Sequence, residues 1–282
     1  MDASAVEDKQ QIHDFIRIGQ WLNDIGLKAP EIYEADEAQG FLLLEDFGDV
    51  SFRKAIEKGQ DVGALYQLAD DVLEHLKVQD CPLSLPDYYS SAIHEKRRFV
   101  VDYYIPAVRG EENPQGLVED YLSVWDGIEK SLPPCPTGFV HADYHLENMM
   151  WLPGEEGVKR LGLLDFQEAL SGPVAYDLVN LLEDARVAVP DDIKNEILGR
   201  QDALVRSWYR ILGTQFHCRV IGLFIKLAQE DGKTQYLQHV PRLGAYIKKG
   251  LEDPLLAPMK RWFKDQKISF DADEVARALG QE

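Results

Sequence analysis

The feature that most constrains the fold is that, after residue 51, short apolar runs are confined to the middle of the chain. The runs lie among loops rich in Asp, His, Gly and Pro, at residues 139–141, 149–152 and 161–164. Runs of this length bounded by such residues are typical of strands. The flanking sequence instead carries apolar residues mostly at helical spacing. We therefore expect an α+β fold in which a few strands lie between helices.

Two further strands are expected near the amino terminus, at 31–35 and 41–45, on either side of a turn that contains Gly40. The clearest helical patterns cover residues 5–25, 62–78, 88–107, 190–212, 214–230, 235–249 and 252–267. Ser4 and Glu7 form a capping-box pattern before the first of these helices. Helices therefore dominate the chain after residue 51.

The charge balance excludes one class of partner. The chain has 30 basic and 49 acidic residues, a formal net charge of −19, which argues against binding nucleic acid. An acidic field can also concentrate a cationic substrate. The apolar stretches are too short to cross a bilayer, and the three widely spaced cysteines suggest neither disulfides nor a zinc site. A cytoplasmic protein without membrane contact is expected.

The segment 138–151 carries the first chemical signal. Asp143 follows an apolar strand, and Asn148 comes five residues later, just before another strand. Phosphoryl transfer to a hydroxyl needs a carboxylate to orient the nucleophile, and a neutral oxygen ligand to help hold Mg²⁺. Asp143 and Asn148 fit those two roles, although both residue types are also common turn formers.

A second carboxylate stands at the end of the next apolar run. Asp165 follows the strand that a Pro153-Gly154 turn separates from the strand after Asn148. A hairpin there would bring Asp165 close to Asn148, where it could supply an anionic Mg²⁺ ligand. The ordered set of three residues is a stronger signal than any one of them.

These residues also carry a family resemblance. His-x-Asp-x-x-x-x-Asn at 141–148, Leu-Asp-Phe-Gln at 164–167 and Gly-Pro-x-x-Tyr-Asp-Leu at 172–178 resemble the aminoglycoside phosphotransferase and choline kinase superfamily. Residues 165–169, 177–184 and 209–242 are similar to bacterial cell-wall amino-sugar kinases, which phosphorylate the anomeric hydroxyl of N-acetylmuramate and N-acetylglucosamine. The resemblance covers nearly the whole chain.

The resemblance implies a role for each matching residue. Asp143 would be the catalytic base, with His141 orienting its loop, and Asn148 and Asp165 would bind Mg²⁺. Asp177 would anchor the catalytic loop. The segment 41–46 resembles a hinge strand, so backbone groups around Glu45 and Phe47 would contact the adenine of ATP. His145 is as well explained by local packing as by a role near the phosphates.

The resemblance also implies a protein-kinase-like fold of two lobes, with a truncated amino lobe at 1–46 and a mainly helical carboxyl lobe at 47–282. Kinases of this type carry a Gly-rich loop and a lysine on the third strand. Neither is found in this sequence, and Glu7 is the candidate for the acid that would pair with that lysine. We expect a missed start or a trimmed sequence to account for this difference.

Three readings of the function stay open. The first is an ATP- and Mg²⁺-dependent kinase of an amino sugar, and the second is a kinase of an aminoglycoside or a choline-like amine. The third is a pseudokinase-like module that binds a nucleotide or a sugar without turnover. Gln215, followed by Phe216 and His217 where the similar kinases more often have arginine, leaves the acceptor open. Arg97 and Arg98, beside Glu95 and Lys96, are expected on a solvated helix face.

Overall fold

The computed structural model describes residues 10–280, whose contacts divide them into two compact units. Unit 1 contains the residues up to Asp87 together with Thr137–Leu182 and Pro190–Arg200. Unit 2 contains Tyr88–Pro136, Glu183–Val189 and the residues from Gln201 onward. The expected boundary at residue 46 falls inside unit 1, so the two lobes stay a prediction. The expected start of the first helix and Glu7 lie outside the described residues.

The first helix of unit 1 is α1, which spans Gln10–Asp24 and buries one apolar face. Phe15 on that face stacks on Phe166, with ring centroids 4.8 Å apart, and Trp21 lies 5.1 Å from Phe139. The strands β1 (Ile32–Asp36) and β2 (Phe41–Leu44) form an antiparallel pair. The amino-terminal helix and strand pair expected from the sequence are thus confirmed within the described residues.

Two more strand pairs complete the described sheets of unit 1. The hairpin predicted around Pro153-Gly154 is present, with β4 (Met149–Trp151) antiparallel to β5 (Leu161–Leu163). The strand β3 (Thr137–Val140) pairs instead with β6 (Leu170–Pro173), which the sequence did not predict. Gly172 and Pro173 are unfavourable strand residues, and pairing with a distant segment overrides that local preference.

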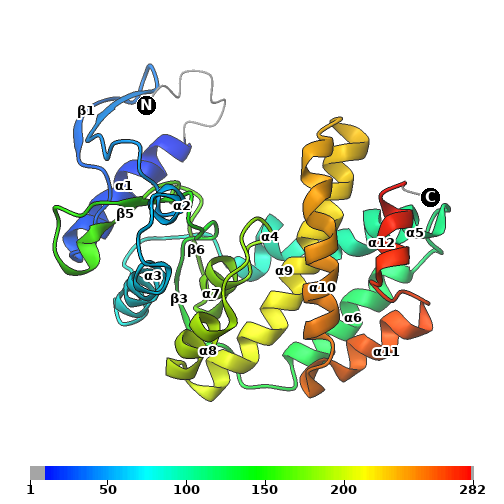
Figure 1. Ribbon diagram of the computed structural model, residues 1–282. Coiled ribbons are helices and arrows are strands. Elements are labelled where there is room, and N and C mark those ends of the chain that lie inside the picture. Colours follow the sequence, from blue (N-terminus) through cyan, green and yellow to red (C-terminus); the bar gives the residue numbers. More distant parts are fainter. Residues whose placement is uncertain (1–9, 281–282) are drawn as a thin grey trace. The chain divides into compact units, whose positions relative to one another are not determined.

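The helices of unit 1 surround these strands (Figure 1). Besides α1, they are α2 (Phe52–Glu57), α3 (Val62–Lys77), α7 (Ala175–Leu182) and α8 (Asp191–Arg200), with a short 3₁₀ turn at Gly157–Arg160. Ser51 and Asp61 accept hydrogen bonds from backbone N–H groups at the starts of α2 and α3. These caps explain why helices begin there.

Unit 2 is built around the 28-residue helix α9 (Ala203–Glu230), which lies beside α10 (Val240–Gly250) in Figure 1. The other helices are α4 (Ala92–Glu95), α5 (Ile105–Arg109), α6 (Leu117–Glu129), α11 (Ala257–Asp265) and α12 (Ala272–Ala278). Short 3₁₀ segments occupy Tyr88–Ser90, Lys96–Arg98, Thr234–His239 and Pro254–Leu256.

Two helix predictions for this part of the chain were wrong. The sequence predicted a break at Gly213, but α9 continues through this buried residue, and the break falls before Ala203. The expected helix 88–107 is a series of short pieces that includes a π-helix at Val100–Tyr104. Tertiary packing decides both outcomes, because α9 is buried on all sides along much of its length.

The described residues form the α+β fold expected from the sequence, with short sheets confined to unit 1. Among those residues, only α9 is long and apolar enough to cross a membrane. Of its most apolar stretch, 67% is buried inside the protein.

Candidate active site

Asp177 on α7 holds the loop between β3 and β4 through two hydrogen bonds. The backbone N–H groups of His141 and Ala142 donate to the two carboxylate oxygens of Asp177, over 2.6 and 3.1 Å. Ala142 has φ of +75°, in the left-handed region that disfavours side chains. The paired hydrogen bonds stabilise this strained turn, after which Asp143 extends into solvent.

Asp177 is fully buried, and burial raises the pKa of its carboxyl to about 7. The two backbone N–H donors oppose that shift, and the nearby charge of Asp143 adds to it. Because Asp177 lies in the first turn of α7, the helix dipole also favours its charged form. Asp177 therefore joins α7 to the loop that carries Asp143.

Two side chains of the same loop converge on one oxygen of Asp143. His145 accepts the N–H of Glu147 at Nδ1, so its Nε2 carries the proton and donates to Asp143 Oδ2 over 3.2 Å. Asn148 Nδ2 donates to the same oxygen and to the Asp143 carbonyl, each over 3.0 Å. The carboxylate is exposed but fixed in direction.

Asp165 meets this cluster from the end of the hairpin. The N–H of Leu164 donates to the Asn148 carbonyl over 3.0 Å, which ties the hairpin to the loop. Asn148 Nδ2 lies 3.4 Å from Asp165 Oδ2, and Gln167 donates to Asp165 Oδ1 over 2.7 Å. Asp165 has φ of +62°, a second strained position in the cluster. The structure thus brings Asp143, Asn148 and Asp165 together.

His141 lies beneath the cluster and is buried. Its Nδ1 accepts the N–H of Asp143 over 3.4 Å, and its Nε2 donates to the Leu164 carbonyl over 3.0 Å. Burial lowers the pKa of His141 to about 4, although the carboxylates of Asp143 and Asp165 oppose the shift. The ring is therefore neutral near pH 7 and links the Asp143 loop to the residue before Asp165.

The residues expected at the adenine lie beside β2 and β5. The Glu45 carboxylate accepts Lys28 Nζ over 2.8 Å, and the Glu45 N–H donates to the Glu31 carbonyl over 2.8 Å. A Cβ added at Gly162 would lie 2.7 Å from the Phe47 ring, so this ring packs directly on the β5 backbone. Any backbone contact from Glu45 to a ligand would come from its carbonyl.

The donor set at the loop and hairpin suits Mg²⁺ better than a transition metal. Among the described residues, no three His, Cys, Asp or Glu side chains are grouped as a metal site. Asn148 and Asp165 offer hard oxygen ligands, and Mg²⁺ is commonly held by one or two carboxylates with phosphate oxygens and water completing its shell. The residues present therefore fit a metal ion that arrives with a phosphate ligand.

Sequence reasoning missed part of this cluster. It left His145 undecided and gave Gln167 no role, although both lie two residues from an aspartate that they contact. That short spacing in a polar loop was the available signal. Gln215 lies instead in unit 2, where it is buried and donates to Glu129 over 2.5 Å.

With this geometry described, the sequence profile of the phosphotransferase enzyme family matches residues 1–211. The chain belongs to this family. The phosphotransferase is 33% identical over 270 residues to an N-acetylmuramate/N-acetylglucosamine kinase of Caulobacter vibrioides, covering 90% of this chain and 74% of that protein. It is 29% identical to the Pseudomonas aeruginosa enzyme of the same name, covering 85% and 73%.

Solved structures show the fold of the phosphotransferase. A choline/ethanolamine kinase family protein from Mesorhizobium loti has a TM-score of 0.60 at 13% identity, covering 95% of this chain and 83% of that one. An ADP-bound aminoglycoside phosphotransferase has a TM-score of 0.56 at 13% identity, covering 83% and 81%. The family expected from the sequence motifs is confirmed, and the fold is that of the choline kinases and aminoglycoside phosphotransferases, whereas the two lobes stay a prediction.

Proposed function

We propose that this phosphotransferase transfers the γ-phosphate of ATP to a hydroxyl group of an amino sugar. The observation that carries the transfer chemistry is the convergence of Asp143, Asn148 and Asp165 on one cluster. The named relatives support an amino sugar as the acceptor, because two of them share 33% and 29% identity with the chain over most of its length.

In the proposed mechanism Asp143 orients the acceptor hydroxyl and takes its proton. His145 and Asn148 keep the carboxylate in one orientation by donating to Oδ2. The acceptor oxygen bonds to the γ-phosphorus as the bond to the β-phosphate oxygen breaks, and ADP leaves with that electron pair. The reaction needs no covalent intermediate with the protein.

Asn148 and Asp165 would hold Mg²⁺, which would supply charge neutralisation for the phosphates. Asn148 would turn its amide oxygen toward the ion, while Gln167 keeps the Asp165 carboxylate in place. The adenine would contact the Glu45 carbonyl and the backbone of Phe47. In this proposal residues 1–46 belong to the nucleotide-binding lobe, and residues 47–282 form the acceptor lobe.

The direct test is an acceptor assay with the full chain, ATP and Mg²⁺. N-acetylmuramate, N-acetylglucosamine, kanamycin and choline are supplied in parallel, and phosphorylated product is measured by mass spectrometry. We expect product from an amino sugar. Asp143→Asn is expected to lower kcat about 100-fold or more, because a general base is removed.

Glu147→Gln is the matched control, because Glu147 is an exposed carboxylate of the same loop. This variant is expected to keep its turnover. Equal turnover of wild type and Asp143→Asn would refute the assigned base. Product from kanamycin or choline alone would replace the amino sugar as acceptor, and Mg²⁺-dependent ATP binding without any product would favour a binding module.

The adenine assignment has its own test at Gly162. Gly162→Ala would push the Phe47 ring away from β5, since the added Cβ overlaps the ring. We expect the KM for ATP to rise severalfold while the KM for the acceptor changes little. Gly154→Ala, in the same hairpin with open space around it, is the control. A rise in both KM values for Gly162→Ala would argue against nucleotide contact at Phe47.

A further inference from the structure

A cavity lies in unit 2, lined by residues between Lys248 and Phe270. Its volume is about 410 Å³, within the range of ~300–1,000 Å³ that is usual for small-molecule sites. Its floor is apolar and comes from the turn after α10, from α11 and from the loop between α11 and α12. The floor residues are Leu251, Phe263, Ile268 and Phe270, all of them buried.

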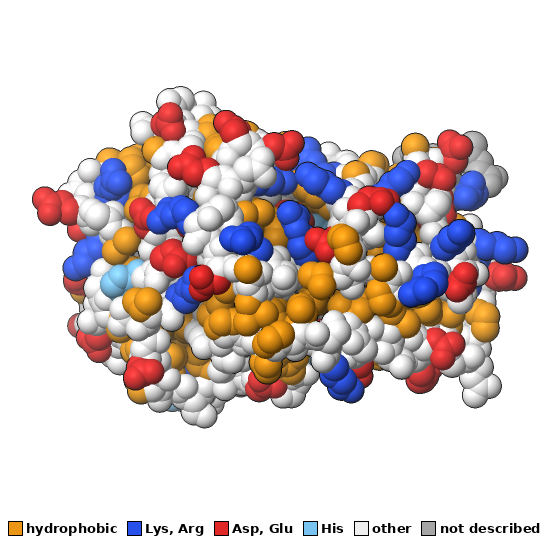
Figure 2. Space-filling view, turned by 90° about the horizontal axis from the view of Figure 1, so that it is seen from below, with side chains coloured by type: hydrophobic (Ala, Val, Ile, Leu, Met, Phe, Trp, Pro, Cys, Tyr) orange, Lys and Arg blue, Asp and Glu red, His pale blue; other side chains and the backbone are white. Residues whose placement is uncertain are grey.

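The rim of this cavity is mostly basic, although the chain as a whole has a net negative charge. Four lysines line it against a single acidic residue, Glu252, whereas the whole chain has 30 basic and 49 acidic residues. The rim lysines are Lys248, Lys260, Lys264 and Lys267. Figure 2 shows Lys and Arg side chains grouped over the end of the protein where α11 lies in Figure 1. A positive rim on an acidic protein attracts anions locally.

The loop that closes the cavity is held in a fixed and strained conformation. Lys267 and Phe270 have φ of +57° and +54°, the left-handed region. The buried Glu274 carboxylate accepts the N–H groups of Ser269 and Phe270 over 2.7 and 2.9 Å. It also accepts the Tyr104 hydroxyl over 3.1 Å. Strained residues persist where the surroundings over-determine them, and such positions cluster at binding sites.

We propose that this cavity binds an anionic amphiphile, in which a carboxylate or a phosphate monoester is joined to an apolar body. The apolar floor would cover the body of the ligand, and the ammonium groups of Lys264, Lys267 and Lys248 would contact its charged group. A bare inorganic anion would leave the floor unused, and a neutral apolar ligand would leave the lysines unused. This proposal is independent of the acceptor chemistry, because none of the cavity residues belongs to the cluster of Asp143, Asn148 and Asp165.

The carboxylates near the rim determine how strongly its lysines attract an anion. Glu252 pairs with Lys260 over 2.6 Å and so competes for that lysine. Asp271 lines an adjoining cavity of about 360 Å³ that shares Lys248 and Phe270, and it accepts the Ser269 hydroxyl over 2.7 Å. Removing the charge of Glu252 should therefore strengthen anion binding, whereas reversing the charge of Lys264 should weaken it.

The test is calorimetric titration of the full chain with four ten-carbon ligands: decanoate, decyl phosphate, decanol and decylamine. We expect one or both anions to bind, with the neutral and cationic ligands at least tenfold weaker. A preference between the two anions would tell carboxylic acids from phosphate monoesters as the source of the ligand. Added salt should weaken binding of the anions.

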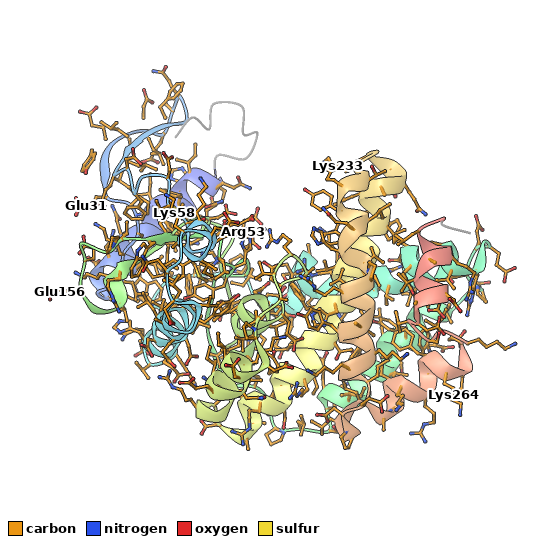
Figure 3. All side chains as sticks on the ribbon, in the orientation of Figure 1. Glu31, Arg53, Lys58, Glu156, Lys233 and Lys264 are labelled. Carbon is orange, nitrogen blue, oxygen red and sulfur yellow. The ribbon has the colours of Figure 1, made fainter. Side chains whose placement is uncertain are left out.

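Three variants test whether the anion binds at this cavity. Lys264→Glu should weaken anion binding about fivefold, and Glu252→Gln should tighten it about twofold, as expected for exposed charges. Lys233→Glu makes the same charge change at the turn after α9, and Figure 3 shows Lys233 well away from Lys264. It should leave binding unchanged. Equal binding of decanol and decanoate, no binding of any ligand, or equal weakening by Lys233→Glu and Lys264→Glu would overturn the proposal.

Discussion

At the scale of single residues, the candidate active site depends on buried groups that hold exposed ones. Asp143 is exposed, but His141, His145 and Asp177 beneath it are buried and fix its loop through hydrogen bonds. A buried ionisable group disfavours its charged form, so burial pushes His141 and Asp177 in opposite directions on the pH scale. These opposite pKa shifts make the stability of the protein depend on pH, which can be measured.

The pKa of His141 is lowered to about 4 in the folded protein, so between pH 6.5 and 4 the unfolded chain binds a proton that the folded chain does not. His141 therefore contributes stability above pH 6.5 that is lost as the pH falls toward 4. The pKa of Asp177 is raised to about 7 in the folded protein. In the unfolded chain the same carboxyl loses its proton above a pH of about 4. Its contribution is present at low pH and is lost as the pH rises toward 7.

In wild type, His141 and Asp177 change the free energy of unfolding with pH in opposite directions. His141→Gln should remove the first pH dependence and leave the second unchanged. We expect the difference in free energy of unfolding between wild type and His141→Gln to shrink by roughly 2–3 kcal/mol between pH 7 and pH 4.5. Urea unfolding at several pH values measures it, and NMR of the His141 ring should show a neutral imidazole at pH 5.5. A difference that stays constant with pH would contradict the shifted pKa of His141.

Residue types and spacing predicted the cluster of Asp143, Asn148 and Asp165, because Asp143 follows an apolar run and Asn148 and Asp165 lie at the same end of a local hairpin. The family resemblance implied two of its supports, His141 and Asp177, whereas His145 was left undecided and Gln167 had no role. The left-handed conformations of Ala142 and Asp165 depend on contacts with distant residues, which the sequence does not display. Arg97 was expected in solvent but is buried, because its guanidinium donates to His94 and Asp126. Arg98, which pairs with Asp102, stays partly exposed.

At the scale of elements, unit 2 depends on close contact between α9 and the irregular segment at 96–104. A Cβ added at Gly222 of α9 would lie 2.1 Å from the Phe99 carbonyl oxygen, which is backbone and cannot turn away. The π-helix at Val100–Tyr104 follows directly. A helix pattern drawn from periodicity alone could not show this, because the irregularity follows from what packs against it.

Gly222→Ala should therefore destabilise the protein by about 3 kcal/mol or more, since a packed backbone must shift. Gly127→Ala, in an exposed position of α6 with open space around it, should instead stabilise by about 0.5–1 kcal/mol through helix propensity. Urea unfolding of both variants provides the comparison. Similar effects of the two substitutions would mean that α9 and the Phe99 segment do not pack this closely.

At the scale of the whole molecule, composition and motifs predicted the fold class and the family, and the spacing of apolar runs predicted the pairs β1–β2 and β4–β5. They placed the start of α9 wrongly and missed β6, because both depend on pairing between segments far apart in the chain. The net charge of −19 argues against polyanionic partners for the chain as a whole, yet four lysines line the cavity of unit 2. Local charge is a property of the folded surface, and average composition does not predict it.

The two units are interleaved along the chain, since unit 1 takes segments on both sides of residues 88–136, which belong to unit 2. During synthesis β3 and the Asp143 loop emerge only after that stretch, and β3 then waits for β6 at Leu170–Pro173. The helix α1 must therefore remain without Phe139 and Phe166, which it contacts, while about fifty residues of another unit are made. Apolar surface of unit 1 is therefore exposed during synthesis, where chaperones can bind it. A frameshift near residue 130 is accordingly more harmful than one near residue 280.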